Sequence, residues 1–207
     1  MISSLSEAAA TYRIVAQAEG KSPRTIEWVE GSVRYLKEFL GDDPPPQELT
    51  RHDLRRFIAA LRERPKWAEH PFNRPKGRIS PTSINNYVRG IKLLFSALER
   101  EGLLPPHEIT TMKAPKIPKK VIVPFTESQI RDVFKALQNG RAPLRDRAMT
   151  WLMLDPGLRV SELINLSDED VELNERQVRV MGKGEKERVL PLGAWVTKAL
   201  LTYKVKA

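Results

Sequence analysis

The 207-residue sequence contains no cysteine, so disulfides and thiolate-bound metal ions are excluded. A chain without cysteine suits a reducing, intracellular compartment. The sequence also lacks any apolar run of the ~18 residues that a membrane-spanning helix needs. Its N-terminus lacks the basic, apolar and small-residue blocks of a signal peptide. We therefore expect a soluble, cytoplasmic protein with no membrane partner.

Histidine is scarce as well. The three histidines, His52, His70 and His107, lie far apart and share no spacing typical of metal ligands. We therefore expect no metal site and no cofactor.

Basic residues outnumber acidic ones by 35 to 26, a net charge of +9. The excess lies mainly in residues 1–120, which carry 21 basic and 14 acidic side chains. A positive field attracts polyanions, because each neutralised phosphate releases bound counterions. Nucleic acid is therefore the leading partner, although a passive basic protein would show the same charge.

Four amphipathic helices are predicted in the first hundred residues, at about 5–20, 23–40, 50–61 and 81–98. Ser22-Pro23 and Ser80-Pro81 each place a capping serine before a proline at the first helical position. Helices with one apolar side can bury it only against each other. We therefore expect a helical bundle over residues 1–104.

A second domain is predicted over residues 125–207, after a basic linker at 105–124 that contains five prolines. We expect helices at about 126–140 and 143–154, a short helix from Val160 and a final helix from Ala194. Three short strands are predicted between residues 171 and 190.

Arg159 lies in the segment Gly157-Leu158-Arg159-Val160-Ser161-Glu162-Leu163, behind a glycine turn and at the start of a helix. A guanidinium offers two parallel donors to phosphate oxygens, and a helix N-terminus adds partial positive charge. This pattern favours a phosphate clamp. A surface ion pair between Arg159 and Glu162 is the alternative.

Lys183 lies between two glycines at the predicted hairpin tip Gly182-Lys183-Gly184. A lysine there could reach a substrate and donate a proton, but most turn lysines are merely solvated. The segment is not a nucleotide-binding Walker loop, because Gln177 replaces its first glycine and Gly184 its magnesium-binding hydroxyl.

Together the two segments resemble the tyrosine recombinases, the phage integrase and Xer recombinase family. Residues 157–163 match that family's Gly-Leu-Arg-x-Ser-Glu-Leu motif, and residues 182–192 match Gly-Lys-Gly-x-Lys-x-Arg-x-x-Pro-Leu. Residues 22–26 and 81–85 are similar to two helix starts of the family's core-binding domain. The resemblance implies a mainly α protein, with a four-helix SAM-like core-binding bundle and the first half of an α+β catalytic domain containing a small three-stranded antiparallel sheet.

The resemblance also implies roles for individual residues. Arg159 would hold the scissile phosphate, Lys183 would protonate the leaving 5′ oxygen, and Glu162 would support the site, with no metal ion required. The partner would be double-stranded DNA, together with other recombinase protomers. The residues predicted to contact DNA are Arg24, Thr25, Arg74, Lys76, Arg78, Asn85, Arg89 and Lys92.

For two sets of these residues, the prediction of DNA contact also has support from the sequence pattern, independent of the family resemblance. Asn85, Arg89 and Lys92 follow at i, i+4 and i+7 of one helix, away from its apolar stripe. The segment 62–78 carries six basic and two acidic side chains among three prolines, which predicts a loop that contacts phosphates and is anchored by Trp67 and Phe72. In both cases a solvated surface is the alternative.

The sequence departs from the family pattern at its end. The family places a His-x-x-Arg box, a further His or Trp, and a nucleophilic Tyr after the strands, whereas this sequence stops 24 residues beyond Lys183. Tyr203 is expected to pack rather than to act as a nucleophile. Asp155-Pro156 also replaces the residues that usually precede the glycine.

Three hypotheses follow from this departure. The chain is a C-terminally truncated recombinase that binds DNA without covalent catalysis, one half of a split recombinase, or a non-catalytic regulator of recombination.

Overall fold

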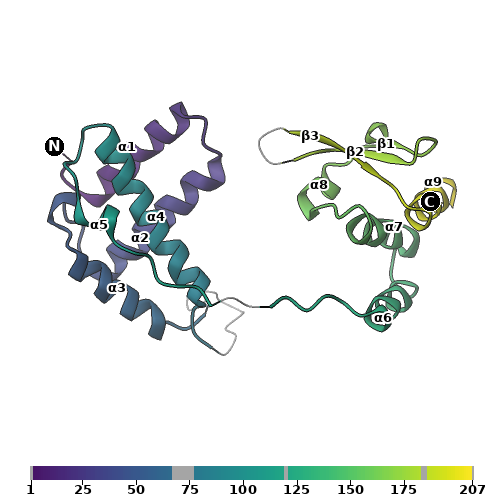
Figure 1. Ribbon diagram of the computed structural model, residues 1–207, viewed down its shortest axis with the longest axis horizontal. Helices are drawn as coiled ribbons and strands as arrows, with labels where there is room; N and C mark the ends of the chain where they lie inside the picture. Colours follow the sequence, from purple (N-terminus) through teal and green to yellow (C-terminus); the bar gives the residue numbers. More distant parts are fainter. Residues whose placement is uncertain (1, 67–76, 119–120, 183–185, 207) are drawn as a thin grey trace. The chain divides into compact units, whose positions relative to one another are not determined.

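The computed structural model describes residues 2–66, 77–118, 121–182 and 186–206 (Figure 1). It divides into two compact units, residues 1–121 and residues 122–207. No helix in these ranges is long and apolar enough to cross a membrane.

The first unit contains the four predicted helices: α1 (Leu5–Ala18), α2 (Pro23–Leu40), α3 (Arg51–Glu63) and α4 (Pro81–Arg100). Both Ser-Pro starts form as predicted, since the Ser22 hydroxyl accepts the Thr25 N–H and the Ser80 hydroxyl accepts the Ser83 N–H. Two short elements were not predicted, the 3₁₀ turn η1 (Pro46–Glu48) and the helix α5 (Glu108–Thr111).

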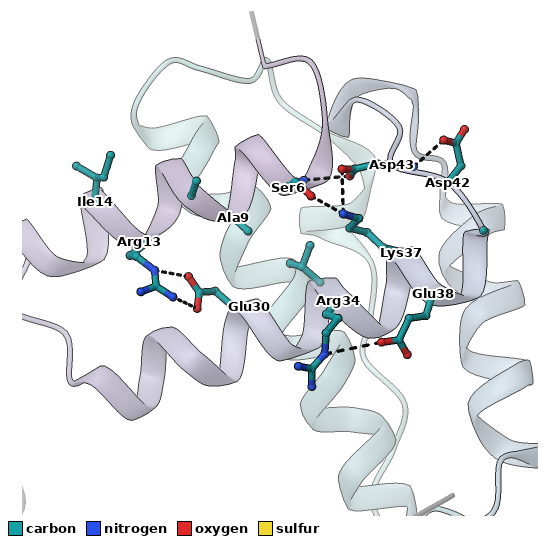
Figure 2. Close-up of a pocket in the computed structure, with 13 residues that line it drawn as sticks. Ser6, Ala9, Arg13, Ile14, Glu30, Arg34, Lys37, Glu38, Asp42 and Asp43 are labelled. Carbon is teal, nitrogen blue, oxygen red and sulfur yellow. Dashed lines mark hydrogen bonds and ion pairs between the residues drawn. The ribbon is translucent and has the colours of Figure 1, made fainter. Parts of the chain in front are cut away.

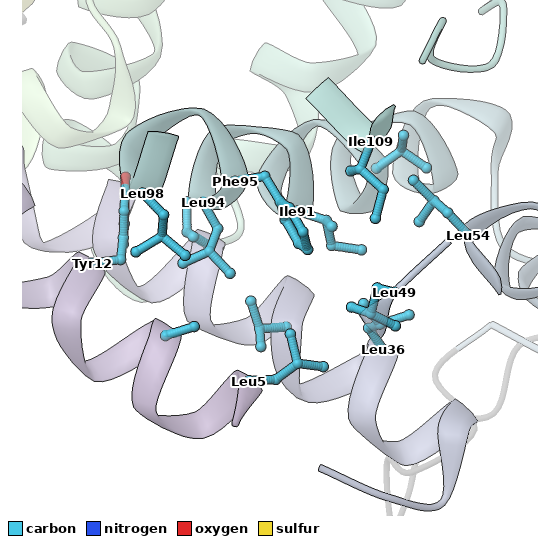
Figure 3. Packing of buried hydrophobic residues seen from close by; sticks show 14 of the residues in the cluster. Leu5, Tyr12, Leu36, Leu49, Leu54, Ile91, Leu94, Phe95, Leu98 and Ile109 are labelled. Atoms are coloured by element: carbon cyan, nitrogen blue, oxygen red, sulfur yellow. The ribbon is translucent and has the colours of Figure 1, made fainter. Parts of the chain in front are cut away.

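Helix α4 forms the centre of the first core. Its Ile91, Leu94 and Phe95 are fully buried, and they face side chains from α1, α2 and α3 (Figure 3). Leu5 and Leu54 are among these facing side chains, and both are also almost completely buried. Apolar residues of α1, α2 and α3 therefore pack against α4, which explains why the bundle forms around it.

The first half of the predicted linker packs against this bundle instead of connecting the units. Ile109 of α5 is 1% exposed, and the His107 N–H donates to Glu99 Oε1 at 2.6 Å. Further along, Asn85 Nδ2 donates to the Pro115 carbonyl at 2.6 Å. Residues 107–115 therefore belong to the first unit, and the connecting segment is shorter than the predicted 105–124.

The second unit contains α6 (Glu127–Leu137), α7 (Pro143–Leu154), α8 (Val160–Ile164), the 3₁₀ turn η2 (Asp168–Asp170) and α9 (Ala194–Lys206). Its three strands, β1 (Val171–Glu172), β2 (Gln177–Met181) and β3 (Glu187–Pro191), form an antiparallel sheet in the order β1-β2-β3.

One face of this sheet is buried. Val178 and Val180 of β2 are buried while Arg179 between them is exposed, as the two-residue period of a strand requires. The buried valines pack with Leu152 of α7 and Val196 of α9. The predicted fold, mainly helical with a small three-stranded antiparallel sheet, is confirmed.

Candidate active site and nucleic-acid interface

A glycine turn places Arg159 at the start of α8. Gly157 has a φ of +70°, a conformation that glycine adopts without strain. The next residue, Leu158, is buried, and its N–H donates to the Leu152 carbonyl of α7 at 3.1 Å. Arg159 is then the N-cap of α8, so the turn is fixed to the core on one side and presents the arginine on the other.

The Glu162 carboxylate holds Arg159 in this position. It accepts the Arg159 backbone N–H at 2.8 Å and a guanidinium N–H at 2.8 Å. Because a guanidinium cannot accept a hydrogen bond, only the carboxylate half of a capping box forms. The Glu162 side chain is 4% exposed while that of Arg159 is 65% exposed. The ion pair that the sequence offered as the alternative is therefore present, but with Glu162 buried rather than at the surface, and most of the arginine remains open to solvent.

Arg188 of β3 is a third member of this cluster, and sequence reasoning gave it no role. Its Nη2 donates to Glu162 Oε2 at 2.9 Å. The Arg159 backbone N–H, followed by the two guanidiniums, holds the pKa of Glu162 below its ordinary value, although burial opposes the shift. The signal available in the sequence was the place of Arg188 within the motif 182–192.

The other predicted catalytic residue, Lys183, lies outside the described residues. The base of its hairpin is described, and there the Gly182 N–H donates to the Lys186 carbonyl at 2.8 Å. The structure therefore brings together Arg159, Glu162 and Arg188. The position of Lys183 in the site stays a prediction.

On the first unit, two of the predicted DNA contacts are exposed cations that have no partner among the described residues. Arg24 at the start of α2 and Arg89 of α4 are both exposed, and neither has a hydrogen-bond or ion-pair partner within the described ranges. Thr25 shares a hydrogen bond with the Ser22 hydroxyl. Arg78 forms an ion pair with Glu63 at 2.7 Å.

Asn85 does not lie where the sequence placed it. It is 8% exposed, and its amide binds the Pro115 carbonyl, so the prediction that it lies away from the apolar stripe is wrong. Lys92 is half-buried and donates to the Met112 carbonyl. A helical spacing alone could not show that a later segment covers this part of α4.

The predicted loop contacts Arg74 and Lys76 lie outside the described residues, as do Trp67 and Phe72.

Comparison with known proteins gives the family. The Phage integrase family model matches residues 124–207. Tyrosine recombinase XerC of Agrobacterium fabrum is 33% identical over 179 residues, covering 83% of this chain and 53% of the relative. XerD of Vibrio cholerae is 34% identical over 176 residues, covering 84% and 54%. This chain belongs to the phage integrase family of tyrosine recombinases. It spans about half the length of the curated relatives it matches.

Solved integrases share the fold of this family member. A lambda integrase tetramer bound to a Holliday junction matches with a TM-score of 0.73 and 16% identity, covering 98% of this chain and 57% of that one. The Tn1549 transposon integrase in complex with a circular intermediate DNA matches with a TM-score of 0.72 and 18% identity, covering 99% and 66%. At these identities the likeness supports the fold alone.

Tyr203 lies in α9 of this integrase-family chain. It is half-buried and lines a hollow with Leu152, Leu163 and Leu200. Neither Arg159 nor Glu162 lines that hollow. The expectation that Tyr203 packs rather than acts as a nucleophile stays a prediction.

The groove between α1 and α2 is poorly suited to bind phosphate (Figure 2). Its cations are already paired: Arg13 with Glu30 at 2.5 Å and Lys37 with Asp43 at 2.9 Å. Four carboxylates and three cations line it. The groove therefore offers a polyanion no positive charge in excess.

Among the described residues, no three histidine, aspartate or glutamate side chains are grouped so that they could hold a metal ion.

Proposed function

We propose that this chain binds double-stranded DNA as part of a site-specific recombinase that acts in DNA recombination and integration in the cytoplasm. The observation that carries the proposal is the fixed and exposed Arg159 guanidinium, held at a helix start by a buried glutamate. A guanidinium that is held in position and exposed to solvent can bind the oxygens of a phosphodiester. Family membership supplies the reaction class.

The first unit would grip the duplex without completing the chemistry. Arg24 and Arg89 are two exposed cations there without a described protein partner, so they can neutralise phosphates at no cost in broken ion pairs. Arg78, with Arg74 and Lys76, would add contacts to the backbone. Such contacts set register and affinity but read no bases.

The second unit would act on the phosphate. Attack on a phosphodiester places additional negative charge on the non-bridging oxygens, and a preorganised guanidinium stabilises that charge. Arg159 would take this role, Glu162 would hold it in place, and Lys183 would give a proton to the leaving 5′ oxygen.

The 207 residues by themselves would form no covalent bond to DNA. Transfer through a phosphotyrosine needs a positioned tyrosine with its activating groups, and no His-x-x-Arg box follows the strands in this sequence. His52-Asp53-Leu54-Arg55 has the same spacing but lies in α3 of the first unit.

A nicked duplex that traps covalent intermediates tests this point. We expect no protein–DNA adduct on a denaturing gel with the 207-residue chain, and an adduct would contradict the proposal. Binding to the same duplex is measured in parallel. Arg159→Ala should weaken binding several-fold, whereas Arg131→Ala, which removes an exposed arginine of α6 paired with Glu127, should leave it unchanged.

Two alternatives remain distinct from this proposal. In the first, a second polypeptide supplies the box and the tyrosine, and adding it would restore the adduct. In the second, the chain occupies recombination sites as a regulator, and it would then compete with an intact recombinase for its core site.

A further inference from the structure

Glu162 lies between two guanidiniums that come from separate elements of the second unit. Its Oε1 accepts from Arg159 at the start of α8. Its Oε2 accepts from the Arg159 backbone N–H and from Arg188 Nη2, which is 26 residues away on β3. One carboxylate therefore connects the arginine-bearing helix start to the hairpin of β2 and β3.

Because Glu162 is buried, its carboxylate depends on the hydrogen bonds that these arginines donate. The Glu162 side chain is 4% exposed and that of Arg188 is 34% exposed. A buried carboxylate is tolerated only when its acceptor sites are filled, because water cannot replace a lost donor. Arg188 supplies a charge-assisted donor to Oε2 that no other described side chain provides.

The base of the hairpin is shaped around the same arginine. A Cβ added at Gly182 would lie 3.3 Å from Arg188 Nη1 and 3.1 Å from the Lys186 carbonyl oxygen. The guanidinium of Arg188 therefore lies beside Gly182 at one end and binds Glu162 at the other. Gly182 immediately precedes Lys183 in the sequence.

We propose that Arg188 is a positioning residue, which fixes the base of the Lys183 hairpin against the start of α8 through Glu162. Arg188 would affect DNA affinity only by positioning Arg159, which would contact the phosphate. This inference therefore rests on the proposed function. Arg188 itself is not assigned a contact to DNA.

The first test follows Glu162 directly by NMR titration of its carboxyl carbon in the full chain. Arg188→Met removes the charge and the donors, so it should raise the Glu162 pKa, and Arg188→Lys should restore part of the lowering. Arg179→Gln is the matched control, because Arg179 on β2 pairs with the half-buried Glu172 and the exposed Glu187 and not with Glu162. An unchanged Glu162 titration in Arg188→Met overturns the proposal.

The second test is a double-mutant cycle on affinity for a duplex. If Arg188 acts through Arg159, then Arg159→Ala weakens binding several-fold in the wild type but has almost no further effect beside Arg188→Met. Arg188→Lys recovers part of the affinity. Fully additive losses in variants that keep their thermal unfolding midpoints overturn the proposal.

Failure of the proposed function gives a different result. If Arg159→Ala leaves DNA affinity unchanged, then the phosphate role of Arg159 is wrong. The Glu162 titration still decides whether Arg188 positions the cluster.

Discussion

At the scale of single residues, the cluster around Glu162 shows what sequence can and cannot provide. The contact between Arg159 and Glu162 follows from their spacing, because a carboxylate at the third helical position reaches back to the N-cap. Arg188 is 26 residues away from Glu162. Its contact depends on the register of β3 in the sheet, which no local pattern specifies.

The lowered pKa of Glu162 predicts a pH-dependent contribution to stability. A carboxyl whose pKa is lower in the folded state stabilises the fold above its ordinary value near 4.5, and this contribution is lost as the pH falls through the folded pKa. Urea unfolding of wild type and Glu162→Gln should therefore differ most near neutral pH and converge in acid. A difference that stays constant with pH would contradict this assignment.

The close approach of α2 to α4 at Gly90 predicts that a larger residue there lowers stability. A Cβ at Gly90 of α4 would lie 2.3 Å from the Ser32 hydroxyl oxygen and 2.8 Å from the Ser32 Cβ on α2. Gly90→Ala should therefore lower the free energy of unfolding by about 1–3 kcal/mol through overpacking.

Gly31 of α2 is the matched control for Gly90. A Cβ there meets nothing within 4 Å, so Gly31→Ala should raise the free energy of unfolding by about 0.4–1 kcal/mol. Equal effects of the two substitutions in urea unfolding would show that α2 and α4 do not approach closely at Gly90.

At the scale of elements, the helix starts were predictable because capping is local. Ser22, Thr50, Ser80 and Thr126 each accept a backbone N–H of the first helical turn. Helix α5 was missed because it is only four residues long, too short for an apolar periodicity to register. Its place is fixed by the burial of Ile109, which is a tertiary contact.

The anchored segment 107–115 predicts a specific pattern of proteolysis. Asn85 and Lys92 of α4 bind the carbonyls of Pro115 and Met112, and cleavage requires a segment to leave its support. Trypsin should therefore cut wild type at Lys113 slowly, and Asn85→Ala with Lys92→Met should increase that rate several-fold. Asn86→Ala, an exposed neighbour on the same helix, serves as the control. Equal Lys113 cleavage rates in all three proteins would show that these contacts do not hold the segment.

At the scale of the whole molecule, composition pointed to polyanions, but it did not select which cations are available. Arg13 and Lys37 are paired with carboxylates in the groove between α1 and α2, whereas Arg24 and Arg89 are exposed without a described partner. The fold was predictable from amphipathic periods and capping because these repeat over many residues. The distribution of ion pairs was not, since it depends on side chains brought together from separate helices.

The most direct test of the account is the salt dependence of duplex binding by the 207-residue chain, measured by fluorescence anisotropy. The logarithm of affinity should fall linearly with the logarithm of salt concentration, and Arg89→Ala should reduce that slope by about 1. Arg13→Ala, which removes an arginine already paired with Glu30, should leave the slope unchanged. Binding without salt dependence, or identical slopes for wild type and Arg89→Ala, would contradict the assignment of the Arg89 side of α4 to DNA binding.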